Sequence, residues 1–257
     1  MIAVISDVDG SMIDEKGRDE GVKESLELLS SLGIKVALAT TKTAAETKEL
    51  WRRVGAGELL AAVELGGALC SSSPLPYSDF EEGGLECLLL GSPIAEFEEE
   101  MERALEGCSY VRLSKATPAQ ASEILGFPEE LAALAVRRQL VEVIWSRDLS
   151  CLLSRVGELE KRGLRAIAGY RFLHVGRHEG KGRAMELMKA LLRARKYIAI
   201  GDSPLDRDML EMADVAIVIP RDGMIDVRPR RADYIVAPYP APQGWVWASR
   251  QIALSLI

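Results

Sequence analysis

The chain has 257 residues, 48% of them hydrophobic, and a net charge of −7. This length is ample for a hydrophobic core, in one large domain or two smaller ones. The negative charge argues against a general nucleic-acid-binding protein. No apolar run approaches the roughly 18 residues of a membrane span, and the chain begins with an expected strand rather than a basic leader. We therefore expect a cytoplasmic monomer or homodimer without nucleic-acid or membrane partners.

The cysteine and amide contents suggest a compartment and a source. Cys70, Cys87, Cys108 and Cys151 form no C-x-x-C pair, so we expect small, reduced, buried side chains rather than disulfides or a zinc site. The sequence contains no asparagine and four glutamines. Because thermolabile amides are depleted in heat-adapted proteins, a thermophilic source is a hypothesis.

The first apolar run, Ile2–Ile5, predicts a short buried strand that delivers Asp7 and Asp9 at its carboxyl end. One interpretation is an Asp-Gly hairpin turn. A calcium loop fails on spacing, because Met12 and Arg18 stand where an EF-hand needs Gly and Glu. A third interpretation is a nucleophilic aspartate followed by an acid/base aspartate, with magnesium between the charges.

A second strand, Ile34–Ala39, runs into the segment Thr40-Thr41-Lys42-Thr43, and a helix is predicted from Ala44. The β-α-β-α alternation predicts a parallel sheet, which places this segment at the same edge as the first strand's end. Hydroxyls, a lysine and a helix N-terminus suit a phosphate group. The alternative is helix capping by Thr41 or Thr43.

A third strand, 61–69, is interrupted by Gly66 and Gly67, which allow either a bulge or close backbone approach by a ligand. From residue 79 the pattern changes to short helices and strands that form few βαβ units. We predict an inserted α+β domain over 79–175, with residues 1–78 and 176–257 forming a Rossmann-like, doubly wound α/β core.

After the insertion, Lys181 opens a helix and a strand over 197–200 ends at Asp202. Ser203 is expected as N-cap of the next helix, and Asp206 follows it. Taken singly, Asp202 could be a turn residue and Lys181 a solvated cation. Taken together, the four chain segments end at one sheet edge, where open α/β sheets bind ligands.

The ordered set Asp7-x-Asp9, Thr40, Lys181 and Gly-Asp202-x-x-x-Asp206 resembles the motifs of haloacid dehalogenase superfamily phosphatases over the whole chain. The insertion resembles that superfamily's second cap type. The segment 40–46 further resembles the mannosyl-3-phosphoglycerate phosphatase family, as do Arg137 and Arg138 followed by Glu142. His174, Gly180–Gly182 and Gly244–Trp245 also fit. Three residues depart from the family pattern: Leu65, Val141 and Leu205.

This resemblance implies a set of residue roles. Asp7 would be the nucleophile and Asp9 the acid/base, with Lys181 and Thr40 stabilising the phosphoryl group. Mg²⁺ would be held by Asp7, the backbone carbonyl of Asp9 and Asp202, with Ser203 and Asp206 in support.

The resemblance also implies binding roles. Thr41, Lys42, Thr43, Gly66 and Gly67 would help to bind a small anionic phosphorylated substrate. In the cap, Arg137 or Arg138 would bind its carboxylate and Glu142 its sugar hydroxyls; a surface ion-pair cluster is the alternative for this trio. The implied reaction is dephosphorylation of mannosyl-3-phosphoglycerate to the compatible solute mannosylglycerate. Alternatives are a phosphatase for glucosyl-3-phosphoglycerate, phosphoglycolate or another sugar phosphate, a phosphomutase, or a catalytically impaired binding module.

Overall fold

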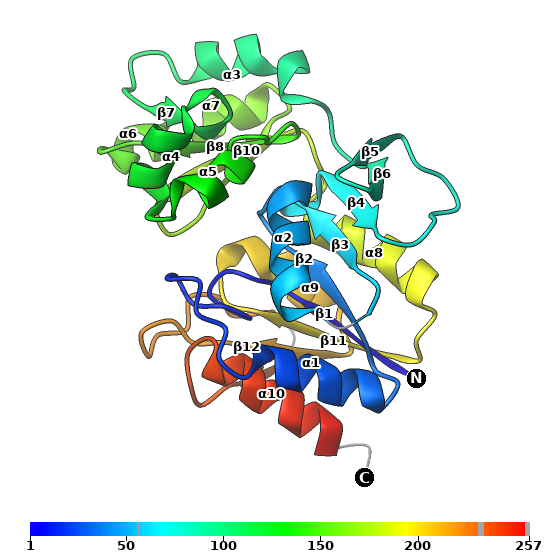
Figure 1. Cartoon of the computed structure of the whole chain (residues 1–257). Coiled ribbons are helices and arrows are strands. Elements are labelled where there is room, and N and C mark those ends of the chain that lie inside the picture. Colours follow the sequence, from blue (N-terminus) through cyan, green and yellow to red (C-terminus); the bar gives the residue numbers. More distant parts are fainter. Residues whose placement is uncertain (56, 231–233, 255–257) are drawn as a thin grey trace.

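A computed structural model describes residues 1–55, 57–230 and 234–254 of the chain. They form two bodies, a larger α/β core and a smaller cap above it that is built around a second sheet (Figure 1). The larger sheet has the strand order β13-β12-β11-β1-β2-β3-β4-β6-β5. Its strands are β1 (Ile2–Ser6), β2 (Lys35–Ala39), β3 (Leu60–Val63), β4 (Ala68–Ser71), β5 (Phe80–Glu82), β6 (Leu85–Leu89), β11 (Lys196–Gly201), β12 (Val215–Val218) and β13 (Tyr234–Val236).

The six strands from β13 to β3 are parallel, as the β-α alternation predicts. β1 lies between β2 and β11, so the chain leaves β1 in one direction along the sheet and returns on its other side. That arrangement is the topological switch point at which doubly wound sheets bind ligands. The end of β1, where Asp7 follows, therefore lies at the position that the fold favours for a site.

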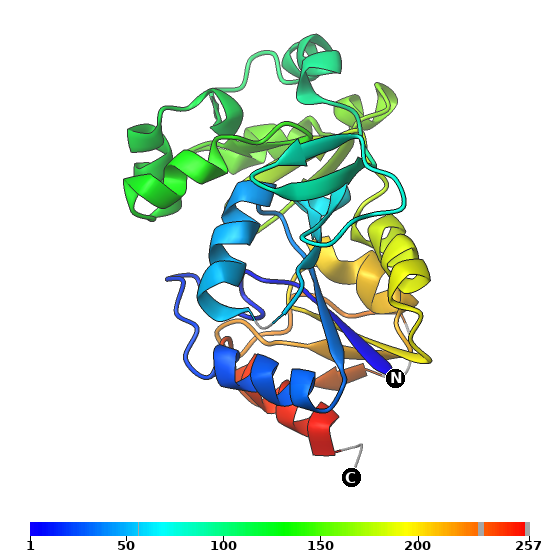
Figure 2. The same cartoon turned by 45° about the vertical axis from the view of Figure 1, so that its right-hand side comes forward.

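Helices cover both faces of this sheet (Figure 2). Alternate residues of β1 serve the two faces: Val4 packs with one group of helices, and Ala3 and Ile5 with the other. The first group is α1 (Val22–Ser31), α2 (Ala44–Val54) and α10 (Gln243–Leu254), and the second is α8 (Lys181–Leu192) and α9 (Arg207–Met212). Both faces of the strands are buried, which explains why the strands are continuous apolar runs.

The second sheet has the order β7-β8-β10-β9 and is antiparallel. Its strands are β7 (Val111–Arg112), β8 (Val141–Trp145), β9 (Arg165–Ala168) and β10 (Phe172–Gly176). The helices of this cap are α3 (Glu98–Ala104), α4 (Pro118–Leu125), α5 (Glu129–Ala135), α6 (Leu149–Ser154) and α7 (Val156–Lys161). α3, α6 and α7 share an apolar cluster with one face of the sheet, and α4 and α5 with the other.

The hairpin of β5 and β6 was expected within the insertion, but it belongs to the core sheet. β6 pairs antiparallel with β4 over Ala68–Ser71, and β5 pairs with β6 at the sheet edge. The sequence boundary at residue 79 is therefore too early, because a composition change does not report strand pairing. The chain crosses to the cap over residues 90–93 and returns over 177–180.

The prediction of reduced cysteines is wrong. Cys70 on β4 faces Cys87 on β6 across the antiparallel pair, and the two form a disulfide. Cys108, after α3, forms a second disulfide with Cys151 on α6. Sequence spacing could not reveal these pairs, because each depends on tertiary contacts that bring distant Cα atoms within 6 Å. The cysteines therefore no longer argue for a reducing compartment. Among the described residues, no helix is both long and apolar enough to span a membrane.

Candidate active site

Three carboxylates converge where β1 and β11 end. Asp7 follows β1, Asp202 follows β11, and Asp206 lies one short helical turn later, in the 3-10 helix Pro204–Asp206. All three are buried, and each offers an oxygen atom within 4.8 Å of the others. Three buried negative charges this close together repel one another strongly, so cations nearby are needed to offset the repulsion.

Lys181 supplies one of these cations. It is the first residue of α8, is 1% exposed, and donates to Asp7 Oδ1 at 2.5 Å and to Asp206 Oδ1 at 2.6 Å. Gly180 precedes the helix with a φ of +87°, a backbone conformation that favours glycine. The structure therefore brings together the residues of three separated sequence motifs.

Burial and mutual repulsion set the protonation of this group. Burial and the charge of Asp206 raise the pKa of Asp7 to about 6, and the charge and hydrogen bond of Lys181 oppose that rise. Burial and the charges of Asp7 and Asp206 likewise hold the pKa of Asp202 well above its ordinary value. Burial alone would lower the pKa of Lys181, but Asp206 and Asp7 raise it above its ordinary value. Lys181 is therefore a fixed positive charge among the three carboxylates.

The donor set fits a hard divalent cation. The converging ligand atoms are all carboxylate oxygens, which magnesium prefers. Asp206 is already occupied, because its two oxygens accept from Lys181, Ser203 and the backbone N–H of Asp202. Asp7 accepts from Lys181, and Asp202 accepts from Ser11 at 3.3 Å and from Arg221 at 2.7 Å. Both have fewer donors than Asp206 and are the carboxylates better placed to bind a metal. The predicted contribution of Asp9, a backbone carbonyl, stays a prediction.

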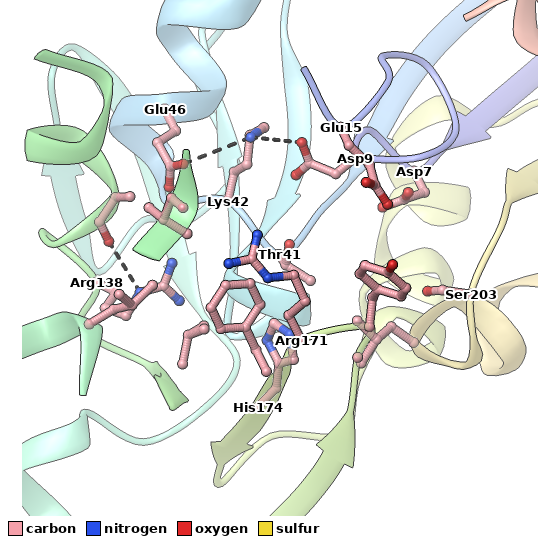
Figure 3. A pocket seen from close by; sticks show the side chains of 18 of the residues that line it. Asp7, Asp9, Glu15, Thr41, Lys42, Glu46, Arg138, Arg171, His174 and Ser203 are labelled. Atoms are coloured by element: carbon pink, nitrogen blue, oxygen red, sulfur yellow. Dashed lines mark hydrogen bonds and ion pairs between the residues drawn. The ribbon is translucent and has the colours of Figure 1, made fainter. Parts of the chain in front are cut away.

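The side chain of Asp9 has a different partner. It points into the pocket, and its Oδ1 pairs with Lys42 Nζ at 2.9 Å (Figure 3). Lys42 also lies 3.8 Å from Glu46 and 5.3 Å from the centre of the Phe127 ring in the cap. Burial alone would lower the pKa of Lys42, but Asp9 and Glu46 raise it. Lys42 is therefore a cation that holds the second aspartate and contacts the cap.

Arg221 was missed by the sequence prediction. It follows β12, its Nη2 donates to Asp202 Oδ2 at 2.7 Å, and it pairs with Glu15 at 3.3 Å. Tyr170 of the cap lies over its guanidinium, 5.2 Å away. The sequence held a signal for Arg221, because a residue just past a parallel strand such as β12 lies at the same sheet edge as Asp7.

Asp7 and Lys181 line a pocket of about 190 Å³ between core and cap. Charged residues of the core line one side, as Figure 3 shows for Asp7, Asp9 and Lys42. The cap side is largely apolar, and its polar members include Arg138, Arg171 and His174. The apolar side chains of the cap wall are Leu113, Leu125, Phe127, Ala135, Val143 and Phe172. The pocket therefore combines a charged core side with a mainly apolar cap side, as ligand pockets commonly do.

The predicted cap trio separates into three different environments. Arg138 is 7% exposed and lines the pocket, with its Nε donating to Ala135 O and its Nη1 to Val141 O. Arg137 is exposed and does not line the pocket. Both residues lie in the turn after α5 rather than on the helix.

Glu142 is not a pocket residue, so its predicted role in sugar binding is wrong. Successive side chains of β8 point to opposite faces, and Val143 lines the pocket while Glu142 is fully buried on the other face. There it pairs with Arg112 Nε at 2.9 Å and accepts the backbone N–H groups of Ser114 and Val143. The alternative of a surface ion-pair cluster is wrong for Glu142 as well, because Glu142 is buried and its partner is Arg112.

The predicted phosphate-binding residues also divide. Thr41 and Lys42 line the pocket, as does Ser203, which was predicted to support the metal site. Thr43 instead forms the capping box of α2 with Glu46 and donates its hydroxyl to Leu134 O of the cap. The side chain of Thr40 does not line the pocket, and its Oγ1 accepts from the backbone N–H of Lys42.

Gly66 and Gly67 do not line the pocket either, so their predicted ligand contact is wrong. A Cβ on Gly66, whose φ is +86°, would lie 2.4 Å from Gly180 O, and one on Gly67 would lie 2.8 Å from Leu140 Cβ. These glycines permit close packing of the core loop against α8 and the cap.

The three residues that depart from the family pattern lie together. Leu65, Val141 and Leu205 form one buried apolar cluster, against which Ile167 packs. Leu65 and Leu205 come from the core, and Val141 and Ile167 from the cap. The departures therefore form an apolar contact between core and cap.

Comparison with known proteins assigns the family. The chain is 36% identical over 256 residues to the mannosyl-3-phosphoglycerate phosphatase of Aeropyrum pernix, covering 94% of this chain and 91% of the relative. It is 28% identical to the Pyrococcus horikoshii enzyme of the same name, covering 84% of this chain and 89% of the relative. It is 25% identical to a glucosyl-3-phosphoglycerate/mannosyl-3-phosphoglycerate phosphatase of Persephonella marina, covering 95% of this chain and 94% of the relative. No protein-family model matches the chain.

Solved structures agree on the fold. A haloacid dehalogenase-like hydrolase from B. subtilis has a TM-score of 0.70 at 14% identity, covering 98% of this chain and all of the other. A subclass IIB sugar phosphatase of that superfamily has a TM-score of 0.65 at 15% identity, covering 99% and 100%. Aeropyrum and Pyrococcus are thermophiles, which agrees with the hypothesis based on the missing asparagine. With its paired aspartates, buried lysine and α+β cap, the chain belongs to the mannosyl-3-phosphoglycerate phosphatase family of haloacid dehalogenase-like phosphoric monoester hydrolases.

Proposed function

We propose that the protein is a Mg²⁺-dependent phosphatase that hydrolyses mannosyl-3-phosphoglycerate to mannosylglycerate and phosphate. The observation that carries this proposal is the position of Asp7, which is buried, lines the pocket and contacts Lys181 at 2.5 Å. A carboxylate nucleophile needs such a cation beside it, because it must approach an anionic phosphate.

The reaction has two steps. An oxygen of Asp7 attacks phosphorus, forming a carboxyl–phosphate bond while the bond to the glycerate oxygen breaks and Asp9 gives that oxygen a proton. Water then attacks the aspartyl phosphate, Asp9 takes a proton from that water, and phosphate leaves with Asp7 restored. Lys42, 2.9 Å from Asp9, holds the acid/base carboxyl in place.

The chain's own residues provide the electrostatic stabilisation. Lys181 stays protonated through both steps, and Asp206 orients it from 2.6 Å. Mg²⁺, held by Asp7 and Asp202, would add positive charge at the phosphoryl oxygens. Asp202→Asn removes only a metal ligand, whereas Asp7→Asn removes the nucleophile together with a metal ligand, so a larger loss in Asp7→Asn than in Asp202→Asn would support the role of Asp7 as nucleophile.

The remainder of the substrate would contact the cap. Phosphoglycerate carries a carboxylate, and the guanidinium of Arg138 faces the pocket with part of its donor set engaged by Ala135 and Val141. Aromatic and aliphatic side chains, including Phe127 and Phe172, would cover the apolar face of a sugar ring.

Glucosyl-3-phosphoglycerate is the second candidate substrate. The cap wall is mainly apolar, and such a wall discriminates weakly between sugars that differ in one hydroxyl orientation. The Persephonella marina relative is named for both substrates.

A substrate panel tests the proposal. Phosphate release is measured with mannosyl- and glucosyl-3-phosphoglycerate, phosphoglycolate, free sugar phosphates and p-nitrophenyl phosphate, each with Mg²⁺ and with EDTA. We expect the highest kcat/KM with mannosyl-3-phosphoglycerate and no release with EDTA. A higher kcat/KM for phosphoglycolate or a free sugar phosphate would contradict the substrate, and a requirement for a bisphosphate activator would indicate a phosphomutase.

A further inference from the structure

Glu64 joins the core to the cap through hydrogen bonds that have no part in the proposed reaction. It follows β3, is 4% exposed, and accepts hydrogen bonds from three successive backbone N–H groups of the cap. These are Gln139 at 3.1 Å, Leu140 at 2.8 Å and Val141 at 3.0 Å. We call this set the Glu64 contact. A buried carboxylate that collects three amide donors is a strongly bound group.

The core backbone is shaped to present this carboxylate. Glu64 and Leu65 both have positive φ angles, 46° and 56°, which non-glycine residues rarely adopt. Hydrogen bonds from Glu64 N to Lys42 O and from Leu65 N to Thr40 O hold the loop in this conformation. The loop that carries Glu64 is therefore tied to the same segment that supplies Lys42 to the pocket.

The Glu64 contact lies at the hinge between core and cap. The two crossing segments run side by side there, with Ser92 N donating to Arg177 O, and Leu90 N and Gly91 N donating to Gly67 O. Ile94 N donates to Gln139 O, within the Glu64 contact itself. Beside it, Leu65 packs with Val141, Leu205 and Ile167. Glu64 thus adds a buried hydrogen-bonded connection between core and cap, next to the two covalent ones.

The residue next to this contact is Arg138. Its guanidinium lines the pocket, as Figure 3 shows, and donates to Ala135 O and Val141 O on either side of the turn. Burial raises the pKa of the Glu64 carboxyl, and the charge of Arg138 opposes that rise. A shift of residues 139–141 would therefore move Arg138 relative to Asp7.

We propose that Glu64 is a positioning residue that fixes the orientation of the cap relative to the core and holds Arg138 in its place on the cap wall of the pocket. It touches neither the phosphoryl group nor the reacting atoms, and it does not line the pocket. This inference rests on the proposed function only in that the enzyme uses cap contacts to bind the non-phosphate part of its substrate.

Glu64→Gln tests the proposal with two readouts. Gln keeps the size of the side chain but places an NH₂ group against amide donors, so the Glu64 contact is weakened. We expect the amide protons of residues 139–141 to exchange at least roughly tenfold faster. We also expect kcat/KM for a sugar phosphoglycerate to fall roughly ten- to hundredfold, while that for p-nitrophenyl phosphate, which lacks the carboxylate, changes less than about threefold.

Glu142→Gln is the matched control. Glu142 is another fully buried glutamate with several hydrogen bonds, but all of them lie within the cap. We expect it to lower thermal stability and to accelerate exchange at Ser114 and Val143 rather than at Gln139 and Leu140. If Glu64→Gln fails to fold, Glu64→Asp keeps the charge at a shorter reach and should give the same pattern with a smaller amplitude.

Two outcomes would overturn the proposal: unchanged exchange at residues 139–141, or equal losses with the large and the small substrate. If the unaltered enzyme hydrolyses p-nitrophenyl phosphate but no sugar phosphoglycerate, the proposed substrate fails. The exchange measurement still decides the role of Glu64 in that case.

Discussion

The core wall of the pocket carries closely paired charges, whereas the cap wall carries mainly apolar side chains. On the core side, Lys181 lies between Asp7 and Asp206, and Arg221 contacts Asp202. On the cap side, residues such as Phe127, Val143 and Phe172 line the same space.

The difference in charge between the two walls indicates that they have different roles. The core wall is built from strand ends and a helix start, which are rigid and suit chemistry that needs fixed charge. The cap wall presents side chains from its own strands, such as Val143 on β8 and Phe172 on β10, together with the turn that carries Arg138. In the proposed function, this wall contacts whatever is attached to the phosphate. Substitutions in the core should therefore affect all substrates alike, and substitutions in the cap should discriminate among them.

Asp7→Asn should have the largest effect. The amide is nearly isosteric but is not a nucleophile, so phosphatase activity should be lost with every substrate while the fold persists. Phosphate release and a thermal melt check the two halves of this expectation. Retained turnover would exclude Asp7 as the nucleophile.

Lys181→Ala should cost roughly 2–4 kcal/mol of transition-state stabilisation, comparable to the loss of one oxyanion donor. It also leaves Asp7 and Asp206 buried without their shared cation, so thermal stability should fall. Single-turnover rates with two unrelated phosphate esters measure the loss. A rate near that of the unaltered enzyme, or a loss confined to one ester, would contradict its place in the common machinery.

Arg138→Lys should discriminate between substrates, because Lys keeps the charge but loses the planar fork that suits a carboxylate. We expect transition-state stabilisation, measured from kcat/KM, to fall by roughly 1.5–3 kcal/mol for carboxylate-bearing substrates. The kcat/KM for p-nitrophenyl phosphate should change little. The exposed neighbour offers a control, since Arg137→Lys should leave both values unaltered. An equal loss of kcat/KM with all substrates in Arg138→Lys would contradict the different roles of the two walls.

His178→Gln should have the smallest effect, and it probes the segment that joins the walls. His178 Nδ1 accepts from Gly180 N, just before Lys181, and burial lowers its pKa from 6.5 to about 4. As pH falls from about 6.5 to about 4, the unfolded chain binds a proton that the folded protein does not, so stability is lost.

The slope should be at most about 1.4 kcal/mol per pH unit for this residue. Urea unfolding at several pH values measures it, and in His178→Gln the dependence should be weaker over this window. Parallel pH profiles of the two proteins would mean that His178 is not neutral in the folded state.

The sequence predicted the core wall better than the cap wall, for a physical reason. Asp7 and Asp202 directly follow buried apolar strands, and parallel strands end at one edge, so their meeting follows from local pattern and topology. Arg221 obeys the same rule and could have been found by it.

The cap positions depend on information that the sequence pattern lacks. The register of β8 decides that Val143 faces the pocket and Glu142 does not, and the turn after α5 decides between Arg137 and Arg138. The pairing of Cys70 with Cys87 and the assignment of β5 and β6 to the core sheet depend on antiparallel pairing between segments that are distant in sequence.

The most direct test of the account is to locate the transferred phosphoryl group. The enzyme is mixed with mannosyl-3-phosphoglycerate and Mg²⁺, quenched during the first turnover and reduced with borohydride, which converts an aspartyl phosphate to homoserine. Peptide mass spectrometry should find homoserine at position 7 and at no other aspartate. Homoserine at another position, or none at all while phosphate is released, would contradict the assignment of Asp7 and the phosphatase chemistry built on it.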